Sequence, residues 1–126
     1  MGDRGKFDRP ERPDRVERPE KLDVPQGTLE LMILTILARE PMHGYGVSQK
    51  LAALSGDAFR VNPGSLFPLL YRLEQDGKLK AEWGASDNNR QAKFYRLTAA
   101  GRRQLEKHRE RWDRVTLAIA GVLEGA

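Results

Sequence analysis

The stretch RVNPGSLFPLLYRLEQD, Arg60–Asp76, determines the fold that the rest of the chain supports. Asn62 can act as an N-cap, and Pro63 suits the first helical position, where a missing N–H costs nothing. Apolar residues then recur at helical spacing and predict a face packed on a core: Leu66, Leu69, Leu70 and Leu73. The other face carries a polar, aromatic and cationic mixture: Ser65, Phe67, Pro68 and Arg72. We therefore predict a short, half-buried helix whose positive outer face enters a DNA groove.

The size and composition of the chain predict one small soluble domain without metal or redox chemistry. Its 126 residues suffice for one modest core. The absence of cysteine excludes Cys-ligated zinc, and the two histidines, His43 and His108, lie far apart in sequence. We recognise no nucleophile with a base and no phosphate-binding glycine loop, so we expect neither an enzyme nor a cofactor. Without an apolar run of about 20 residues or a signal peptide, we expect a cytoplasmic protein and no membrane partner.

Positive charge is concentrated in residues 60–103, which include the Arg60–Asp76 segment. The net charge of the chain is +4 with a pI near 9.6. Between Arg60 and Arg103, nine Lys and Arg face four Asp and Glu. A polyanionic partner selects such a distribution, and a basic solvated surface is the alternative interpretation.

Three parts are predicted along the chain. Residues 1–21 repeat an Arg-Pro-acid pattern with nearly balanced charge, which is typical of a disordered tail. Residues 22–97 carry the helical and hairpin patterns and are assigned to a DNA-binding domain. Residues 98–126 are assigned to a C-terminal dimerisation helix.

The first predicted helix starts after Thr28, a candidate cap, and ends at Arg39-Glu40-Pro41. It is apolar on nearly all sides, so every side must be covered. A partner subunit can supply that cover, through contacts assigned to Leu29, Ile33 and Ile36. Full burial in the core of its own chain is the alternative.

The second helix is expected to begin at His43 or Gly44 and to stop at Ser55-Gly56. Its inner side is assigned to four residues: Tyr45, Val47, Leu51 and Leu54. Gly44 and Gly46 each weaken a helix start by roughly 1 kcal/mol relative to alanine, so we expect another element close to them. His43 is expected to form a structural hydrogen bond rather than to bind a ligand.

Gly77 is expected to end the helix of residues 63–76 in a left-handed backbone conformation, and a β-hairpin follows it. Residues 79–83 and 91–97 form its arms, and 84–89 (GASDNN) have turn chemistry throughout. Alternation predicts Tyr95 and Leu97 pointing inward, with Arg90 and Lys93 near the free end. Three helices and a basic hairpin predict a mainly α fold with a small β-hairpin, a winged helix-turn-helix.

A long last helix is predicted from Thr98, its cap, to about Leu123. Six positions, apolar except for His108, follow one another in alternating steps of three and four residues, the spacing of a coiled-coil seam: Leu105, His108, Trp112, Val115, Ile119 and Val122. We assign this seam to dimerisation, with a seam packed within its own chain as the alternative.

Three motifs in register resemble the PadR-like family of transcriptional regulators: PMHGYGVSQKL, VNPGSLFPLLYRLEQDGKL and KFYRLTAAGRRQL. The resemblance covers about residues 22–126. It implies a winged helix-turn-helix repressor that dimerises through its first and last helices, in the short subfamily with a single C-terminal helix. Two departures stand out. Phe67 replaces the common tyrosine and cannot donate to a phosphate, and Asp87-Asn88-Asn89 replaces a denser arginine run in the wing.

The predicted DNA contacts divide by role. Contacts with phosphates are assigned to four cations and one phenol: Lys50, Arg72, Arg90, Lys93 and Tyr45. Contacts with base edges are assigned to Asn62 and Ser65 at the leading end of the helix. Phe67 is assigned to packing against sugar or backbone. Alternatively, Asn62 only caps and Arg72 only pairs with Asp76. A dimer is expected to read a pseudo-palindromic operator, with half-sites about 34–36 Å apart or a multiple of that. The alternative function is a winged-helix module that binds an acidic protein.

Trp112 is the candidate for effector binding. Its WDRV context is similar to that of a tryptophan that helps some short PadR-like proteins bind aromatic drugs. The similarity implies a small aromatic effector that releases DNA, and a tryptophan in the dimer core is the alternative.

Overall fold

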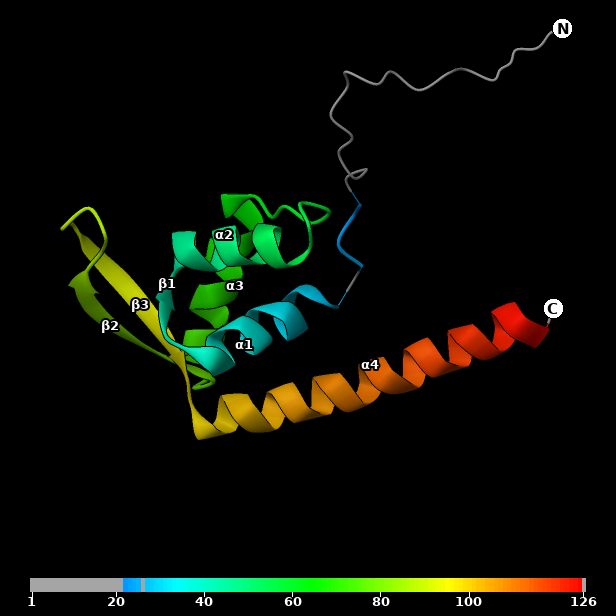
Figure 1. Ribbon diagram of the computed structural model, residues 1–126. Helices are drawn as coiled ribbons and strands as arrows, with labels where there is room; N and C mark the ends of the chain where they lie inside the picture. The colour runs from blue at the N-terminus through cyan, green and yellow to red at the C-terminus, as the bar shows by residue number, and fades with distance from the viewer. Residues whose placement is uncertain (1–21, 26, 126) are drawn as a thin grey trace, which may run out of the picture.

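The computed structural model describes residues 22–25 and 27–125, so the tail assigned to residues 1–21 lies outside them. The described residues form four helices and a three-stranded antiparallel sheet, which lies at one end of the molecule (Figure 1). The elements in chain order are α1 (Leu29–Arg39), β1 (Met42–His43), α2 (Gly44–Leu54), α3 (Pro63–Gln75), β2 (Leu79–Ala85), β3 (Gln91–Leu97) and α4 (Ala99–Gly125). This arrangement confirms the predicted winged helix-turn-helix with a long C-terminal helix.

Helix α3 forms as its sequence predicts. The side chain of Asn62 accepts a hydrogen bond from the Ser65 amide at 3.0 Å, and Pro63 occupies the first turn. The four leucines of its inner face are buried, and Gly77 takes a left-handed φ of +76° just after the helix. Pro68 stays within the helix, near enough to its start that the lost hydrogen bond is tolerated.

Helix α1 runs through the middle of the core. Ile33 and Leu34 are fully buried, and Ile36 and Leu37 nearly so, against α2, α3, the sheet and the start of α4. Ile33 and Ile36, which were assigned to dimerisation, are therefore covered by their own chain. Leu29 remains partly exposed.

Two local expectations for α1 and α2 are met only in part. Thr28 occupies the N-cap position of α1, but its hydroxyl donates to the Pro25 carbonyl at 2.6 Å instead of accepting a hydrogen bond from an amide of the helix. On α2, only Val47 and Leu51 of the assigned inner side are buried. Tyr45 lies on the opposite side of the helix, and Leu54 falls at its last position, beyond the edge of the core, so both are largely exposed.

The start and the end of α2 agree with the predictions. His43 is the N-cap, and its Nδ1 accepts a hydrogen bond from the Gly46 amide at 3.0 Å. The helix ends at Ser55, and Gly56 follows with a left-handed φ of +62°.

The hairpin is longer than predicted, and a third strand joins it. Strand β2 continues to Ala85, so the turn lies after it. Tyr95 and Leu97 on β3 are buried, as alternation predicts. The two-residue strand β1 pairs with the other edge of β3 and gives the order β1-β3-β2. Two residues are too short for a strand pattern, so the sequence carried no sign of it.

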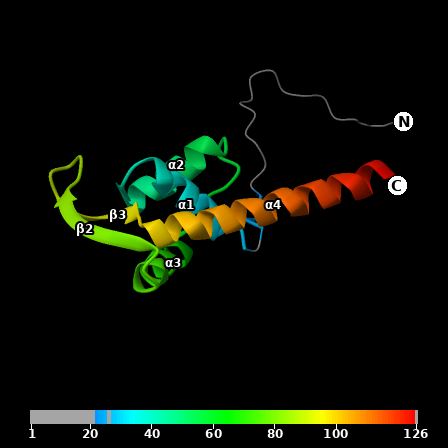
Figure 2. The ribbon, with the colours of Figure 1, turned by 90° about the horizontal axis from the view of Figure 1, so that it is seen from below.

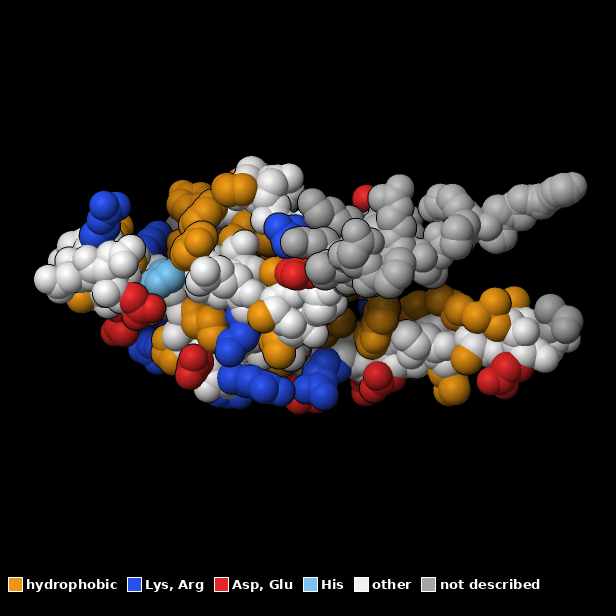
Figure 3. All heavy atoms as spheres, turned by 45° about the horizontal axis from the view of Figure 1, so that its top comes forward, with side chains coloured by type: hydrophobic (Ala, Val, Ile, Leu, Met, Phe, Trp, Pro, Cys, Tyr) orange, Lys and Arg blue, Asp and Glu red, His pale blue; other side chains and the backbone are white. Residues whose placement is uncertain are grey.

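Helix α4 packs its first half on α1 and projects beyond the domain (Figures 1 and 2). The Thr98 hydroxyl accepts from the Gly101 amide at 3.0 Å, which confirms the predicted cap. Along the seam, exposure rises from 6% at Leu105 to 40% at Trp112 and 70% at Val122. Figure 3 shows apolar side chains gathered along the projecting half. None of the helices in the described ranges is long and apolar enough to cross a membrane.

Candidate nucleic-acid interface

A concavity of about 470 Å³ separates the hairpin from the first turns of α2 and α3. Four of the eight residues assigned to DNA line it: Tyr45, Phe67, Arg90 and Lys93. His43, Gln49 and the turn residues Ser86, Asp87 and Asn88 complete much of its wall. The fold thus brings together two cations, the rings of two tyrosines and one phenylalanine, and several amide and hydroxyl groups from three separate segments.

Gly44 allows α2 and α3 to approach each other at this concavity. A Cβ atom at Gly44 would lie 2.8 Å from Cζ of Phe67 and closer still to the adjacent ring carbon Cε1. The ring therefore occupies the space that a side chain at position 44 would take. A close approach was expected at both Gly44 and Gly46, and at Gly44 it sets the spacing between the start of α2 and the outer face of α3.

Lys93 joins the hairpin to α3. Its Nζ lies 2.8 Å from Oε1 of Glu74 and 5.6 Å from the centre of the Tyr95 ring. The hydrogen bond with Glu74 raises the pKa of Lys93. The ammonium group is thus held on the face of the hairpin that is turned toward α3.

The other assigned residues lie outside the concavity. Asn62 and Ser65 line a smaller hollow on another side of α3, with Arg60 and Val24. The Asn62 oxygen is already engaged as the cap. Lys50 lines a groove that adjoins the concavity and shares His43, Gln49 and Asp87 with it.

Arg72 points toward α1 rather than toward Asp76. Its Nη2 lies 3.6 Å from Oε1 of Glu30, whose other oxygen, Oε2, lies 2.7 Å from Nε2 of His108 and accepts a hydrogen bond from Gln104 at 3.2 Å. Burial works to raise the pKa of Glu30, but the hydrogen bonds from His108 and Gln104 and nearby positive charge outweigh it and lower that pKa. This cluster joins residues more than 40 positions apart, which no local pattern could indicate.

Two aromatic side chains near Lys93 were not assigned from the sequence. Tyr71 on α3 and Trp83 on β2 are both well exposed. The helical repeat of α3 and the alternation of β2 could have placed each on a known face. Their exposure, however, depends on where the core ends.

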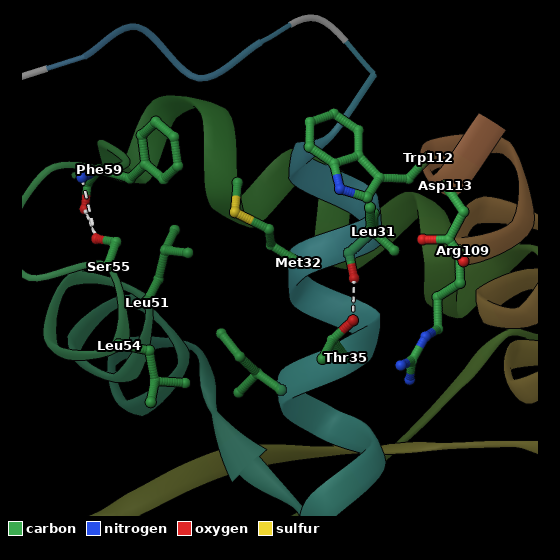
Figure 4. Close-up of a pocket in the computed structure, with 11 residues that line it drawn as sticks. Leu31, Met32, Thr35, Leu51, Leu54, Ser55, Phe59, Arg109, Trp112 and Asp113 are labelled. Carbon is green, nitrogen blue, oxygen red and sulfur yellow. Dashed lines mark hydrogen bonds between the residues drawn. The ribbon is translucent and has the colours of Figure 1, made fainter. Parts of the chain in front are cut away.

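A second cavity, of about 380 Å³, lies where α1, α2 and α4 meet (Figure 4). Trp112, Arg109 and Asp113 reach it from α4, and Leu31 and Met32 from α1. Thr35, Ile36, Leu51, Leu54, Ser55 and Phe59 complete its wall. The cavity is mainly apolar and has one cation and one carboxylate near Trp112. Within the described part of the chain, no three His, Cys, Asp or Glu side chains lie close enough together to hold a metal ion.

Comparisons with known proteins agree on one family. Residues 33–107 match the model of the transcriptional regulator PadR-like family. The transcriptional regulator Rv3488 of Mycobacterium tuberculosis (strain ATCC 25618 / H37Rv) is 35% identical over 96 residues, which cover 76% of this chain and 86% of the relative.

Solved structures show the same architecture. A PadR-like transcriptional regulator from Bacillus cereus strain ATCC 14579 matches with a TM-score of 0.70 and 32% identity, over 80% of this chain and 96% of that one. A PadR family transcriptional regulator from Eggerthella lenta DSM 2243 matches with a TM-score of 0.69 and 32% identity, over 80% and 86%. The residues matched by the family model include most of α1 and all of α2, α3 and the hairpin.

Proposed function

The chain belongs to the PadR-like family of transcriptional regulators, and from that premise we propose that it is a dimeric repressor that binds double-stranded DNA sequence-specifically. The observation that carries this proposal is the concavity between hairpin and helices, where Tyr45, Phe67, Arg90 and Lys93 converge. A groove with cations near its rim and aromatic rings in its wall fits a phosphate backbone.

In the proposed complex, the outer face of α3 enters the major groove while the hairpin follows the adjacent backbone. Arg90 neutralises a phosphate near the end of the hairpin. Lys93 exchanges its contact with Glu74 for a phosphate, or shares the two, since an ammonium group has three donors. Asn62 and Ser65 stand at the leading end of α3, where side chains reach base edges.

The proposed dimer uses the projecting half of α4. Trp112, Val115, Ile119 and Val122 continue a coiled-coil seam past the point where the chain's own core ends. Exposed apolar rows of this kind are typical of subunit interfaces. Leu29, which is partly exposed at the start of α1, adjoins this surface in our proposal. Two copies then present two α3 helices to a pseudo-palindromic operator.

We further propose that the cavity at Trp112 admits a small aromatic effector. The indole, the other lining residues Met32 and Phe59, and the cation Arg109 suit a flat apolar molecule with a polar group. Such a ligand releases DNA only if it binds better to a dimer whose α3 helices have the wrong separation. A fluorescent aromatic probe, anilinonaphthalene sulfonate, should brighten with the wild type and less with Trp112→Ala.

The DNA-binding proposal is tested with a fluorescein-labelled duplex from upstream of the chain's own gene, by fluorescence anisotropy at several salt concentrations. We expect Arg90→Ala to weaken binding and to lower the slope of log K against log salt by about 0.9, the effect of one lost phosphate contact. Arg114→Ala removes the same charge from an exposed site on α4 and is the matched control.

Two results would contradict the proposal. If no duplex is bound even at low salt, the hairpin surface is more consistent with a module that binds an acidic protein. If Arg90→Ala and Arg114→Ala have the same affinity and salt slope as the wild type, Arg90 is not a phosphate contact.

A further inference from the structure

Trp83 is a large aromatic residue left 70% exposed on the hairpin. Alternate residues of a strand share a face, so Trp83 lies on the same face of β2 as Leu79, which is buried, and Ala81, which is partly buried. The face that covers the core at the base of β2 thus continues outward to Trp83. The exposed indole of Trp83 is the first side chain on this face of β2 that lies beyond the edge of the core.

The pairing of the strands shows what this face is turned toward. Trp83 is the direct partner of Lys93 in the antiparallel register, and direct partners lie on the same face. Lys93 reaches Glu74 on α3 at 2.8 Å. Trp83 therefore stands beside Lys93 on the side of the hairpin that is turned toward α3.

Helix α3 presents a second exposed ring close to the contact between Lys93 and Glu74. Tyr71 is 59% exposed and precedes Glu74 by three residues, so the two are neighbours on the helix surface. Its phenol lies near enough to Lys93 to contribute to the raised pKa of that ammonium group. Figure 2 shows α3 beside the base of the hairpin, whose end extends past it. Tyr71 and Trp83 thus border the space between helix and hairpin, with Lys93 between the elements that carry them.

We propose that Trp83 and Tyr71 form a contact for the sugar–phosphate backbone of the DNA strand that passes between α3 and the hairpin. This proposal rests on the function proposed above and names two residues that it did not include. The surface is continuous with the concavity, because Lys93 belongs to both.

The chemistry of the two rings fits a backbone rather than a base edge. The indole N–H and the phenol O–H each donate one hydrogen bond to a phosphate oxygen. The ring faces pack on deoxyribose, which is the apolar part of the backbone. Lys93 supplies the positive charge. A contact of this kind adds affinity to every duplex and carries no sequence preference of its own.

The test uses the fact that the chain contains two tryptophans, Trp83 and Trp112. In the Trp112→Phe variant, indole emission reports on Trp83 alone, and the affinity of this variant for the duplex serves as its own reference. Acrylamide quenching is measured with and without saturating unlabelled duplex. We expect the quenching constant of Trp83 to fall by at least roughly half, because DNA covers a ring that is otherwise open to solvent.

Binding of the labelled duplex is measured in parallel, in the wild-type background, for single substitutions. We expect Trp83→Ala and Tyr71→Ala each to weaken binding roughly three- to tenfold, equally for operator and unrelated duplex. Trp83→Phe should fall between, since it keeps the ring and loses the N–H. Leu117→Ala, which removes an exposed apolar side chain from α4, is the matched control. Circular dichroism checks that each variant is folded.

The possible outcomes separate this proposal from the one it rests on. If duplex binds but Trp83 stays equally open to acrylamide and Trp83→Ala binds like the wild type, the aromatic contact is refuted and the DNA-binding function stands. If the substitutions weaken only the operator, the rings read sequence and the backbone assignment is wrong. If no duplex binds to the wild type, both proposals fall.

Discussion

The Glu30 carboxylate joins three helices through one side chain. It lies in the first turn of α1 and contacts His108 and Gln104 of α4 and Arg72 of α3. A carboxylate in the first turn is also favoured by the helix dipole. Glu30 thus holds the start of α4 against α1, and it places one proposed phosphate-binding residue on the side of α3.

The lowered pKa of Glu30 predicts a dependence of stability on pH. The folded chain binds this proton less tightly than the unfolded chain, whose carboxyl has the ordinary value of 4.5. The contribution to the free energy of unfolding is therefore complete above that value and is lost as pH falls through the folded pKa. Between about pH 5 and pH 3, urea unfolding of Glu30→Gln should change less with pH than that of the wild type.

The matched control for this prediction is Glu106→Gln, which replaces an exposed carboxylate on α4. It should follow the pH dependence of the wild type. Equal pH dependence of Glu30→Gln and the wild type would show that the contacts of Glu30 do not stabilise the folded chain.

Two of the glycines in helix α4, Gly101 and Gly121, have opposite surroundings, and they show how the helix is held in place. Gly101 is buried in the first turn, where a Cβ would collide with the Lys78 carbonyl oxygen and lie 3.1 Å from Cγ of Leu97. That carbonyl also accepts a hydrogen bond from the Thr98 amide at 3.2 Å, so it cannot easily move. Around Gly121, apart from its chain neighbours and the nearby backbone of α4 itself, no atom of the described residues comes within 4 Å of an added Cβ. The start of α4 therefore depends on a missing side chain, while its far end is open.

We expect the two alanine substitutions to shift stability in opposite directions. Gly101→Ala should lower the free energy of unfolding by about 1–3 kcal/mol, because backbone must move to admit the methyl group. Gly121→Ala should raise it by up to about 1 kcal/mol through helix propensity alone. Urea unfolding at a fixed protein concentration measures both. A neutral Gly101→Ala would mean that α4 can shift along the sheet at little cost.

At the scale of the whole molecule, a winged helix-turn-helix domain carries an apolar seam that its own core does not cover. The domain's own core ends near Leu105, whereas the seam continues to Val122 with increasing exposure. The 27-residue length of α4 carries the seam well past the other helices (Figure 1). A second copy would cover these side chains and set the distance between the two α3 helices.

Two substitutions two residues apart test the proposed dimer. Ile119→Glu places a charge on the seam, and we expect a monomer by sedimentation equilibrium because an unpaired buried carboxylate is costly. Leu117→Glu places the same charge on the other side of the helix, at a residue that is 75% exposed, and should leave the dimer intact. A monomeric wild type, or equal behaviour of the two variants, would refute the seam as the interface.

Local chemistry was enough to predict most of the elements. Helix α3 could be read from Asn62, Pro63, four leucines and Gly77, because caps, the helical repeat and left-handed glycine act within a few residues. The inward side of β3 and the cap of α4 at Thr98 follow for the same reason. The three motifs also predicted the family, which the comparisons confirm. The residues assigned to DNA, to the effector and to the dimer remain predictions.

The features that only the tertiary structure decided are contacts and burial, because both depend on segments that are far apart in the chain. It placed Arg72 beside Glu30, Lys93 beside Glu74, and β1 against β3. It also decided exposure: Tyr45 and Leu54 lie outside the core, Ile33 and Ile36 inside it, and Trp83 just beyond its edge. A periodic pattern states which side of a helix or strand a residue occupies. Whether that side is covered depends on the packing of other elements, because burial is a property of the whole fold.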